Sequence, residues 1–328
     1  MRIVIVGVGA VGGTVAARLH LAGHDVVGVA RGAHGQAIRE RGLRFESPAD
    51  AHTVPLAVVG SVSEVHWRDG DVAALAMKSQ DTTAVLHELR RVAPADTPIV
   101  CLQNGVDNER QALRLFPNVY GVCVMLPADH LEPGRVRVYT NPSGLLDVGR
   151  YPHGSDATAD ELAAVFTSAG FGSVARPDIM RWKYRKLILN LANAIEALLG
   201  PFKRWPTGGD LVARVNAEGM AVLDAAGIDL VAEEEDAARR GDTLTIQRVG
   251  GERRQGGSTM QSLQRGTPVE TDFLNGEIVL LGRQYGVATP ANALLQRLLA
   301  EAAARGEPPA QHTEEELVNM LPAREVHD

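Results

Sequence analysis

Three polar side chains share one face of an otherwise apolar segment that runs from Lys186 to Asn193. In a helix of about 100° per residue, Asn190 lies roughly 40° and Asn193 roughly 20° from Lys186, so the three form one polar stripe. A lysine can stabilise and protonate an oxygen that gains charge, and buried amides need partners that a ligand can supply. The stripe predicts that this face of the helix lines a cleft in which a ligand binds. The alternative is a lysine that reaches solvent beside two amides bonded to neighbouring helices.

A second polar segment, Gly257-Ser258-Thr259-Met260-Gln261, is followed by Glu270-Thr271-Asp272-Phe273-Leu274-Asn275-Gly276. We expect this pair of segments to carry part of the chemistry, with Glu270 as a candidate functional residue. Glu270 also has a structural interpretation. Thr267-Pro268-Val269-Glu270 fits a capping box with proline at the first helical position, in which Glu270 closes on the backbone N–H of Thr267.

Two more polar clusters come directly after predicted strands. Lys78-Ser79-Gln80 comes after Val72 to Met77, and Gln103-Asn104-Gly105 comes after Ile99 to Leu102. Ligands of open α/β sheets bind at the carboxyl ends of parallel strands, so both clusters are placed to hold a ribose, a phosphate or a substrate oxygen. For Lys78, an ordinary loop lysine is the alternative.

The chain begins with a short apolar run that leads into a glycine-rich turn, Gly7-Val8-Gly9-Ala10-Val11-Gly12. In this pattern the first glycine permits a tight turn, the second lets the backbone approach a pyrophosphate, and the third lets the helix pack close to the strand. The helix from Val11 to Leu21, stopped by Gly23, and a second strand from Asp25 to Ala30 supply the required context. We therefore expect a dinucleotide whose diphosphate sits on the helix N-terminus and is held by Gly7, Gly9, Ala10, Val11 and Gly12. A glycine-rich turn without a ligand is the alternative.

The end of the second strand favours NADP(H) over NAD(H). No acidic residue stands there to hold a ribose 2'-hydroxyl, because Asp25 lies at the start of the strand and Arg31 comes directly after its end. An arginine at this place can pair with a 2'-phosphate, which a carboxylate would repel. An ordinary solvated arginine is the competing interpretation.

Composition excludes several classes of protein. The chain has 328 residues, is 45% hydrophobic and carries a net charge of −7, which is typical of a globular protein of two domains and argues against general nucleic-acid binding. Its two cysteines, Cys101 and Cys123, fall in predicted strands and read as core residues of a reducing cytosol, and the ten histidines form no metal cluster. The N-terminal apolar stretch is too short for a signal or membrane helix. We expect a cytoplasmic protein without a membrane partner.

The predicted elements form an α/β fold, an N-terminal Rossmann-type doubly wound sheet followed by an all-helical second domain. Strands alternate with helices to about residue 125, which predicts a parallel sheet with helices on both faces. Next come a hairpin or meander from Arg135 to Arg150 around Asn141-Pro142-Ser143-Gly144, a helix from Asp156 to Gly170 and a last strand from Ser173 to Arg176. The predicted strands of the sheet are Arg2 to Val6, Asp25 to Ala30, Thr53 to Val59, Val72 to Met77, Ile99 to Leu102 and Val119 to Met125.

Beyond Pro177 the pattern is almost entirely helical, which predicts a dinucleotide-binding domain over residues 1–176 and a helical substrate domain over 177–328. Within the helical domain, Glu233-Glu234-Glu235-Asp236 reads as a solvated helix face. Thr313-x-x-Glu316 reads as a capping box that opens the final helix.

Taken in order, these motifs identify a family. The series Gly7-x-Gly-Ala-Val-Gly, Lys78-x-Gln80, Gln103-Asn104-Gly105, Trp182-x-x-x-Lys186-Leu-x-x-Asn190, Ser258-x-Met260-x-x-Leu263 and Glu270-x-Asp-Phe-Leu-Asn-Gly276 resembles the 2-dehydropantoate 2-reductase (ketopantoate reductase) family. The resemblance spans nearly the whole chain. It implies an NADPH-dependent reduction of a 2-oxo acid to a 2-hydroxy acid, in a cleft between a Rossmann domain and a helical domain, as in pantothenate biosynthesis.

The resemblance also implies residue roles. Lys186 looks like the general acid and Glu270 its acidic partner. Asn190 and Ser258 look like substrate ligands with Asn193 beside them, and Asn104, Lys78 and Gln80 like contacts of cofactor or substrate. The chain departs from the family at Ala194, where the family's helix usually carries a second substrate-binding asparagine, and this departure puts ketopantoate itself in doubt.

The residue types suit this chemistry on physical grounds as well. Hydride delivery to a ketone carbon leaves an alkoxide that a lysine can stabilise and protonate. The basic run Arg181, Lys183, Arg185 and Lys186 suits a small anionic substrate. Two alternatives remain: another dehydrogenase of the opine or hydroxy-acid type, and a regulator that senses NADP(H) without catalysis. A homodimer is left open.

Overall fold

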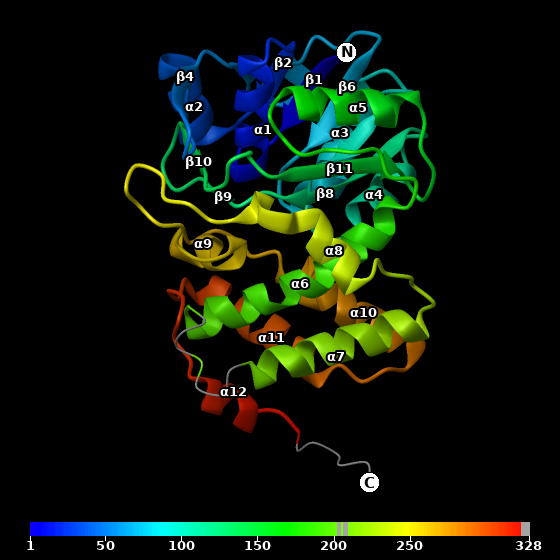
Figure 1. Ribbon diagram of the computed structural model, residues 1–328, viewed down its shortest axis with the longest axis vertical. Coiled ribbons are helices and arrows are strands. Elements are labelled where there is room, and N and C mark those ends of the chain that lie inside the picture. Colours follow the sequence, from blue (N-terminus) through cyan, green and yellow to red (C-terminus); the bar gives the residue numbers. More distant parts are fainter. Residues whose placement is uncertain (202–204, 206–208, 323–328) are drawn as a thin grey trace. The chain divides into compact units, whose positions relative to one another are not determined.

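The computed structural model describes residues 1–201, 205 and 209–322 (Figure 1). The chain divides into two compact units. The first holds Met1–Lys183 together with Val231–Arg254, and the second holds Tyr184–Leu230 and the chain from Gln255 onward. The first stretch of the first unit thus ends at Lys183, inside a helix, whereas the sequence places the boundary at residue 176. The first unit also contains the later segment Val231–Arg254, which lies within the predicted second domain.

The first unit is built on a seven-stranded sheet in the order β11-β8-β7-β6-β1-β2-β5, parallel except for β11, which is antiparallel to β8. The chain runs from β1 to β2 on one side and later crosses to β6 on the other, so the switch point lies between β1 and β6, where ligands of such sheets bind. The strands are β1 (Arg2–Val6), β2 (Val26–Val29), β5 (Ala57–Val59), β6 (Asp71–Leu75), β7 (Ile99–Cys101), β8 (Val119–Met125) and β11 (Leu145–Arg150).

Helices cover both faces of this sheet, as expected of a doubly wound fold. Successive residues of a strand point to opposite faces. In β1, Ile3 and Ile5 join an apolar cluster with residues of α1 and α5, whereas Val4 and Val6 join another with residues of α3 and α4. The helices of this region are α1 (Ala10–Leu21), α2 (Gly32–Arg41), α3 (Thr82–Val92), α4 (Asn108–Leu113) and α5 (Ala157–Ser168).

A second, four-stranded sheet in the order β4-β3-β10-β9 corrects two predictions. The predicted strand Thr53 to Val59 is two strands in different sheets, because Pro55 has no N–H for a ladder and separates β4 from β5. The predicted hairpin from Arg135 to Arg150 is also wrong, since β10 pairs with β3 and β9 while β11 pairs with β8. The strands of the second sheet are β3 (Leu43–Glu46), β4 (Ala51–Val54), β9 (Ala128–Asp129) and β10 (Arg135–Val138).

The segment before the long helix is also less regular than predicted. Residues 173–176 form no strand; Gly172 and Ala175 make isolated parallel bridges to β11. Two glycines that face each other across β8 and β11, Gly121 and Gly149, leave room beside the sheet. A Cβ on Gly149 would lie 1.9 Å from the carbonyl oxygen of Arg176, and one on Gly121 would lie 3.3 Å from Cδ of Lys183. This glycine pair lets the first turn of α6 (Ile179–Leu199) approach the sheet closely.

The segment that returns to the first unit contains α8 (Glu233–Arg240). Its Arg239 forms an ion pair of 2.5 Å with Asp147 of β11, which also pairs with Arg176. Glu233, Glu234 and Glu235 are exposed as expected, but Asp236 is buried and accepts a hydrogen bond from Arg240. The solvated face therefore covers only the first three of these four acidic residues.

The second unit is helical, as predicted. Asn275 of α10 donates to the carbonyl of Leu191 in α6, and Glu218 of α7 accepts from the first backbone N–H groups of α11. The capping box of Thr313 and Glu316 is confirmed. In the described part of the chain, no helix is long and apolar enough to cross a bilayer. Besides α6, the helices are α7 (Asp210–Ala225), α9 (Ser258–Gln264), α10 (Asn275–Tyr285), α11 (Pro290–Arg305) and α12 (Glu314–Asn319).

Candidate active site

The three glycines after β1 have different surroundings. Gly7 has a φ of +100°, and a Cβ there would lie 2.6 Å from the backbone nitrogen of Met77. A Cβ on Gly12 would lie 2.0 Å from the carbonyl oxygen of Gly7, so this glycine permits close packing of α1 on β1. Around a Cβ on Gly9, by contrast, no heavy atom of the described chain beyond Gly9 and its sequence neighbours lies within 4 Å. The turn therefore needs glycine for its own geometry at Gly7 and Gly12 and leaves open space at Gly9.

The open space at Gly9 is what a dinucleotide requires. Gly9 is the N-cap residue of α1, whose first turn begins with Ala10 and Val11 and contains no acidic side chain. The backbone N–H groups of a helix N-terminus and its dipole attract a phosphate. These residues fit the pyrophosphate of a dinucleotide, which brings hydride chemistry to the site when bound.

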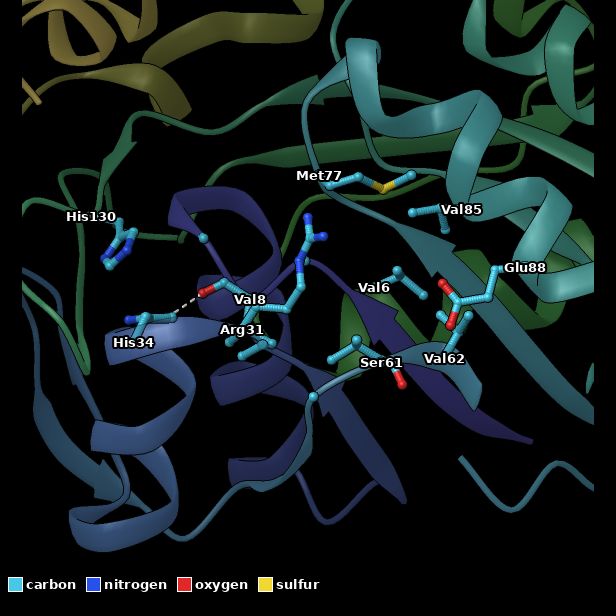
Figure 2. A pocket seen from close by; sticks show the side chains of 15 residues that line it. Val6, Val8, Arg31, His34, Ser61, Val62, Met77, Val85, Glu88 and His130 are labelled. Carbon is cyan, nitrogen blue, oxygen red and sulfur yellow. Dashed lines mark hydrogen bonds between the residues drawn. The ribbon is translucent and has the colours of Figure 1, made fainter. Parts of the chain in front are cut away.

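A pocket extends from this turn toward Arg31, the N-cap residue of α2 (Figure 2). In Figure 2, His34 and His130 lie on one side of Arg31, and Met77, Val85 and Glu88 lie on the other. The residues that line the pocket are Val6, Gly7, Val8, Gly9, Val29, Ala30, Arg31, His34, Gly60, Ser61, Val62, Met77, Val85, Glu88 and His130.

Arg31 is the positive charge of this pocket. Its side chain is 74% exposed, and its guanidinium lies 4.0 Å from Asp81. An exposed ion pair of this length contributes little, so a phosphate with better geometry can displace the carboxylate. Glu88 lines the same pocket and disfavours an anion near it. That Arg31 pairs with a 2'-phosphate stays a prediction.

The loops after β6 and β7 are bonded to each other, so the structure brings Lys78 and Asn104 to the same edge of the sheet. The amide of Gln103 donates to the carbonyl of Met77, and the amide of Asn108 donates both to Ser79 Oγ and to the carbonyl of Asn104. Lys78 and Asn104 are partly exposed and Gln80 is exposed. Sequence reasoning missed Asn108, although its place in the first turn of a helix after Gln103-Asn104-Gly105 is a usable signal.

The basic run in α6 does not face a substrate as a whole. Lys183 is buried, and its ammonium lies 2.5 Å from the carboxylate of Glu109, which has no exposed surface. The same ammonium donates to the carbonyls of Gln103 and Val122, at 3.0 and 3.3 Å. Burial raises the pKa of Glu109, and the charge of Lys183 opposes this shift. The predicted anion-binding role is therefore wrong for Lys183.

The polar stripe of α6 has the predicted geometry. Nδ2 of Asn193 lies 3.5 Å from Oδ1 of Asn190. The residue Asn190 is 5% exposed, and Lys186 is partly exposed. The stripe continues to Glu196, whose carboxylate accepts a hydrogen bond of 2.7 Å from the backbone N–H of Gly257.

Gly257 brings a second predicted segment to this stripe. A Cβ on Gly257 would lie 2.8 Å from the Glu196 carboxylate and 3.2 Å from Oδ1 of Asn193. Ser258, the next residue, therefore lies beside the end of the stripe. Glu196, one helical turn beyond Asn193, is not among the predicted site residues, although its spacing extends the polar pattern.

Glu270 lies outside any regular helix. In the described chain no α-helix begins at Pro268; Glu270 instead precedes a short 3-10 turn, Thr271–Phe273, and α10 begins only at Asn275. The capping-box interpretation of Glu270 is therefore wrong. Asn275, from the same motif, binds the carbonyl of Leu191 and so ties the motif to α6. That Glu270 works with Lys186 stays a prediction.

Comparisons with known proteins agree with this arrangement. Residues 3–153 match the model of the family "Ketopantoate reductase PanE/ApbA", and residues 178–303 match that of its C-terminal domain. The 2-dehydropantoate 2-reductase of Archaeoglobus fulgidus is 31% identical over 91% of this chain and 96% of its own.

Two solved structures are similar over the same length. A PanE/ApbA family ketopantoate reductase from Ralstonia eutropha has a TM-score of 0.79 at 30% identity, covering 93% of this chain and 99% of its own. A D-mandelate dehydrogenase, solved with NADH and anilino(oxo)acetate, has a TM-score of 0.79 at 25% identity, with the same coverage. With its open glycine turn and the two family domains in order, the chain is an NADP-dependent oxidoreductase that belongs to the ketopantoate reductase family.

Proposed function

We propose that this chain reduces a 2-oxo acid to the 2-hydroxy acid with NADPH, and that Lys186 is the general acid. The observation that carries the proposal is the polar stripe of α6, in which a partly exposed Lys186 shares a helix face with the buried Asn190 and with Asn193. A regulator that only binds NADP(H) needs no such proton donor in its second unit. Family membership supports the same reaction type.

In this proposal the first unit holds the cofactor. The backbone of Gly7, Gly9, Ala10, Val11 and Gly12 binds the pyrophosphate, and Arg31 binds the 2'-phosphate. Bound NADPH supplies the hydride. Lys78, Gln80 and Asn104, at the carboxyl ends of β6 and β7, contact the cofactor, and Asn104 also contacts the substrate.

Residues of the second unit act on the substrate. As the carbonyl carbon accepts the hydride, negative charge develops on its oxygen, and the ammonium of Lys186 stabilises this charge and then donates its proton. Such proton transfer contributes roughly 10²- to 10⁴-fold to a rate. Glu270 orients the ammonium, and Asn190, Asn193 and Ser258 hold the oxo acid so that the reacting atoms start close to their final geometry.

We propose further that the substrate carries a larger or less polar substituent than ketopantoate. Ala194 offers a methyl group where the family's helix usually has an amide, which removes hydrogen-bonding sites. The structural likeness to a D-mandelate dehydrogenase favours the same direction. An apolar site rejects an added hydroxyl only weakly, so ketopantoate is expected to react, but slowly.

An NADPH-oxidation assay across 2-oxo acids tests this proposal. We expect turnover with several, and a bulkier or more apolar acid such as phenylglyoxylate should exceed ketopantoate in kcat/KM. Ala194→Asn should shift the ratio back toward ketopantoate. Absence of turnover with every 2-oxo acid, with NADPH still bound, would favour a sensor, and turnover only when an amine is added would favour an opine dehydrogenase. If ketopantoate is the best substrate, the argument from Ala194 is wrong. That the protein works in a reducing cytosol and that it forms a homodimer remain predictions.

A further inference from the structure

His34 is bonded through both ring nitrogens to two separate loops of the first unit. Its Nε2 lies 2.7 Å from the carbonyl oxygen of Val8, within the glycine turn (Figure 2). Its Nδ1 accepts a hydrogen bond from the backbone N–H of Gly134 at 2.8 Å. A carbonyl can only accept and an amide N–H can only donate. Both bonds are therefore made by a single form of the ring, the neutral imidazole with its proton on Nε2.

The surroundings of His34 hold the ring in this orientation. His130 packs against it with ring centroids 4.0 Å apart, and Nδ1 of His130 in turn donates to the carbonyl of Arg135 at 3.2 Å. Gly134 has a φ of +79°, and a Cβ there would lie 3.0 Å from the Cβ of Ala37 in α2. The ring thus projects from α2 and lies between the glycine turn and the loop that precedes β10.

The bond to Val8 bears on cofactor binding through the geometry of one peptide group. The carbonyl of Val8 and the N–H of Gly9 belong to the same planar peptide and point in opposite directions. A carbonyl held toward His34 therefore turns the N–H of Gly9 away from it, and the space around Gly9 is open. This peptide lies between the Cα atoms of Val8 and Gly9, and because Gly9 has no side chain, the peptide would rotate more easily without such a restraint.

We propose that His34 is a positioning residue for the dinucleotide: it fixes the Val8–Gly9 peptide so that the glycine turn presents its N–H groups to the pyrophosphate. The inference rests on the cofactor of the proposed function and not on its substrate. Since the pyrophosphate is common to NADPH and NADH, loss of His34 weakens the binding of both cofactors by the same factor. Loss of Arg31, in contrast, weakens only the binding of NADPH, which carries the 2'-phosphate.

Three variants separate this role from a general structural one. In His34→Gln, the side-chain amide reaches the position of Nε2 and can still donate to Val8. In His34→Asn, the shorter side chain can replace only Nδ1 and accept from Gly134, and His34→Ala replaces neither. The matched control is His153→Ala, which changes an exposed histidine outside the pocket.

The measurement is the Kd of NADPH and of NADH by fluorescence titration, with thermal unfolding recorded for each variant. His34→Ala and His34→Asn should weaken both cofactors by about tenfold, the loss expected for one hydrogen bond, whereas His34→Gln and His153→Ala should stay within about threefold of the wild type. Equal Kd values for the Gln and Asn variants, or a loss confined to NADPH, would overturn the proposal. If His34→Ala does not fold, the Gln and Asn pair decides. Because binding alone is measured, failure to turn over any 2-oxo acid leaves this test intact.

Discussion

Two lysines one helical turn apart in α6 have opposite surroundings. Lys183, in the first turn, lies against Gly121 and is 3% exposed, with the Glu109 carboxylate and two backbone carbonyls around its ammonium. Lys186 begins a polar stripe and is partly exposed. A general acid must release its proton during the reaction. Deprotonation of Lys183 would leave the buried charge of Glu109 uncompensated, so only Lys186 is suited to that task.

The same distinction separates other charged and titratable groups of the chain. His34 resembles Lys183, since every donor and acceptor on its ring is used within the protein. Arg31 resembles Lys186, because it is mostly exposed and close to a site that suits a ligand. Groups of the first kind should govern stability and the shape of the site, and groups of the second kind should govern binding and rate. Substitution of each residue tests this division.

The largest expected effect is on stability. Lys183→Met leaves the Glu109 carboxylate buried without its partner, which typically costs about 3 to 5 kcal/mol of unfolding free energy. The double variant Lys183→Met/Glu109→Gln removes both charges and should regain most of this loss. Urea unfolding measures both values. A single variant as stable as the wild type would show that the ion pair contributes nothing to stability and that Lys183 does not differ from Lys186 in this respect.

Arg31→Ala should affect binding and spare stability. Loss of one charge-assisted contact typically costs about 1.5 to 3 kcal/mol, so the Kd of NADPH should rise by roughly tenfold or more while that of NADH changes little. Wild-type protein should also bind NADPH more tightly than NADH. Titration of the protein with each cofactor measures these Kd values. Equal values for NADPH and NADH in the wild type would show that Arg31 does not bind a 2'-phosphate.

The smallest expected effect is a pH dependence of stability. Burial lowers the pKa of His34 from its ordinary value of 6.5, although the bond to Val8 opposes this shift. Since the unfolded chain then binds a proton more readily, the contribution of His34 is complete above pH 6.5 and is lost as the pH falls below that value. The charged and titratable residues Arg31, Glu88 and His130 line the same pocket, so the variant used in this experiment leaves them unchanged. Urea unfolding between pH 7.5 and 5.5 should show a steeper loss for wild-type protein than for His34→Gln; parallel curves would contradict this.

Local signals in the sequence predicted the parts of the fold that depend on short stretches of chain. The strands Arg2–Val6 and Val119–Met125 have the predicted bounds, and the glycine turn and the α6 stripe have the predicted geometry. Apolar runs, glycine spacing and helical periodicity each act within a few residues, so they can be recognised without a tertiary structure.

Other errors concern contacts between distant segments, whereas those at Pro55, at residues 173–176 and at Glu270 are local. Nothing near Arg135–Val138 indicates that this strand pairs with Leu43–Glu46. The burial of Lys183 involves Glu109 and the glycines of β8 and β11, and the segment Val231–Arg254 contacts the first unit through the ion pair of Arg239 with Asp147. A charged residue within a basic run looks the same in sequence whether its partner is water or a buried carboxylate.

Chemical rescue of Lys186→Ala tests the proposal that Lys186 donates the proton. With NADPH bound and a 2-oxo acid that the wild type reduces, the single-turnover rate of the variant should fall by about a hundredfold or more, and the Kd of NADPH should stay near the wild-type value. Added methylammonium should then restore part of the rate in proportion to its concentration, because it supplies the missing proton. A variant that reduces the same acid at nearly the wild-type rate without any amine would show that Lys186 is not the proton donor.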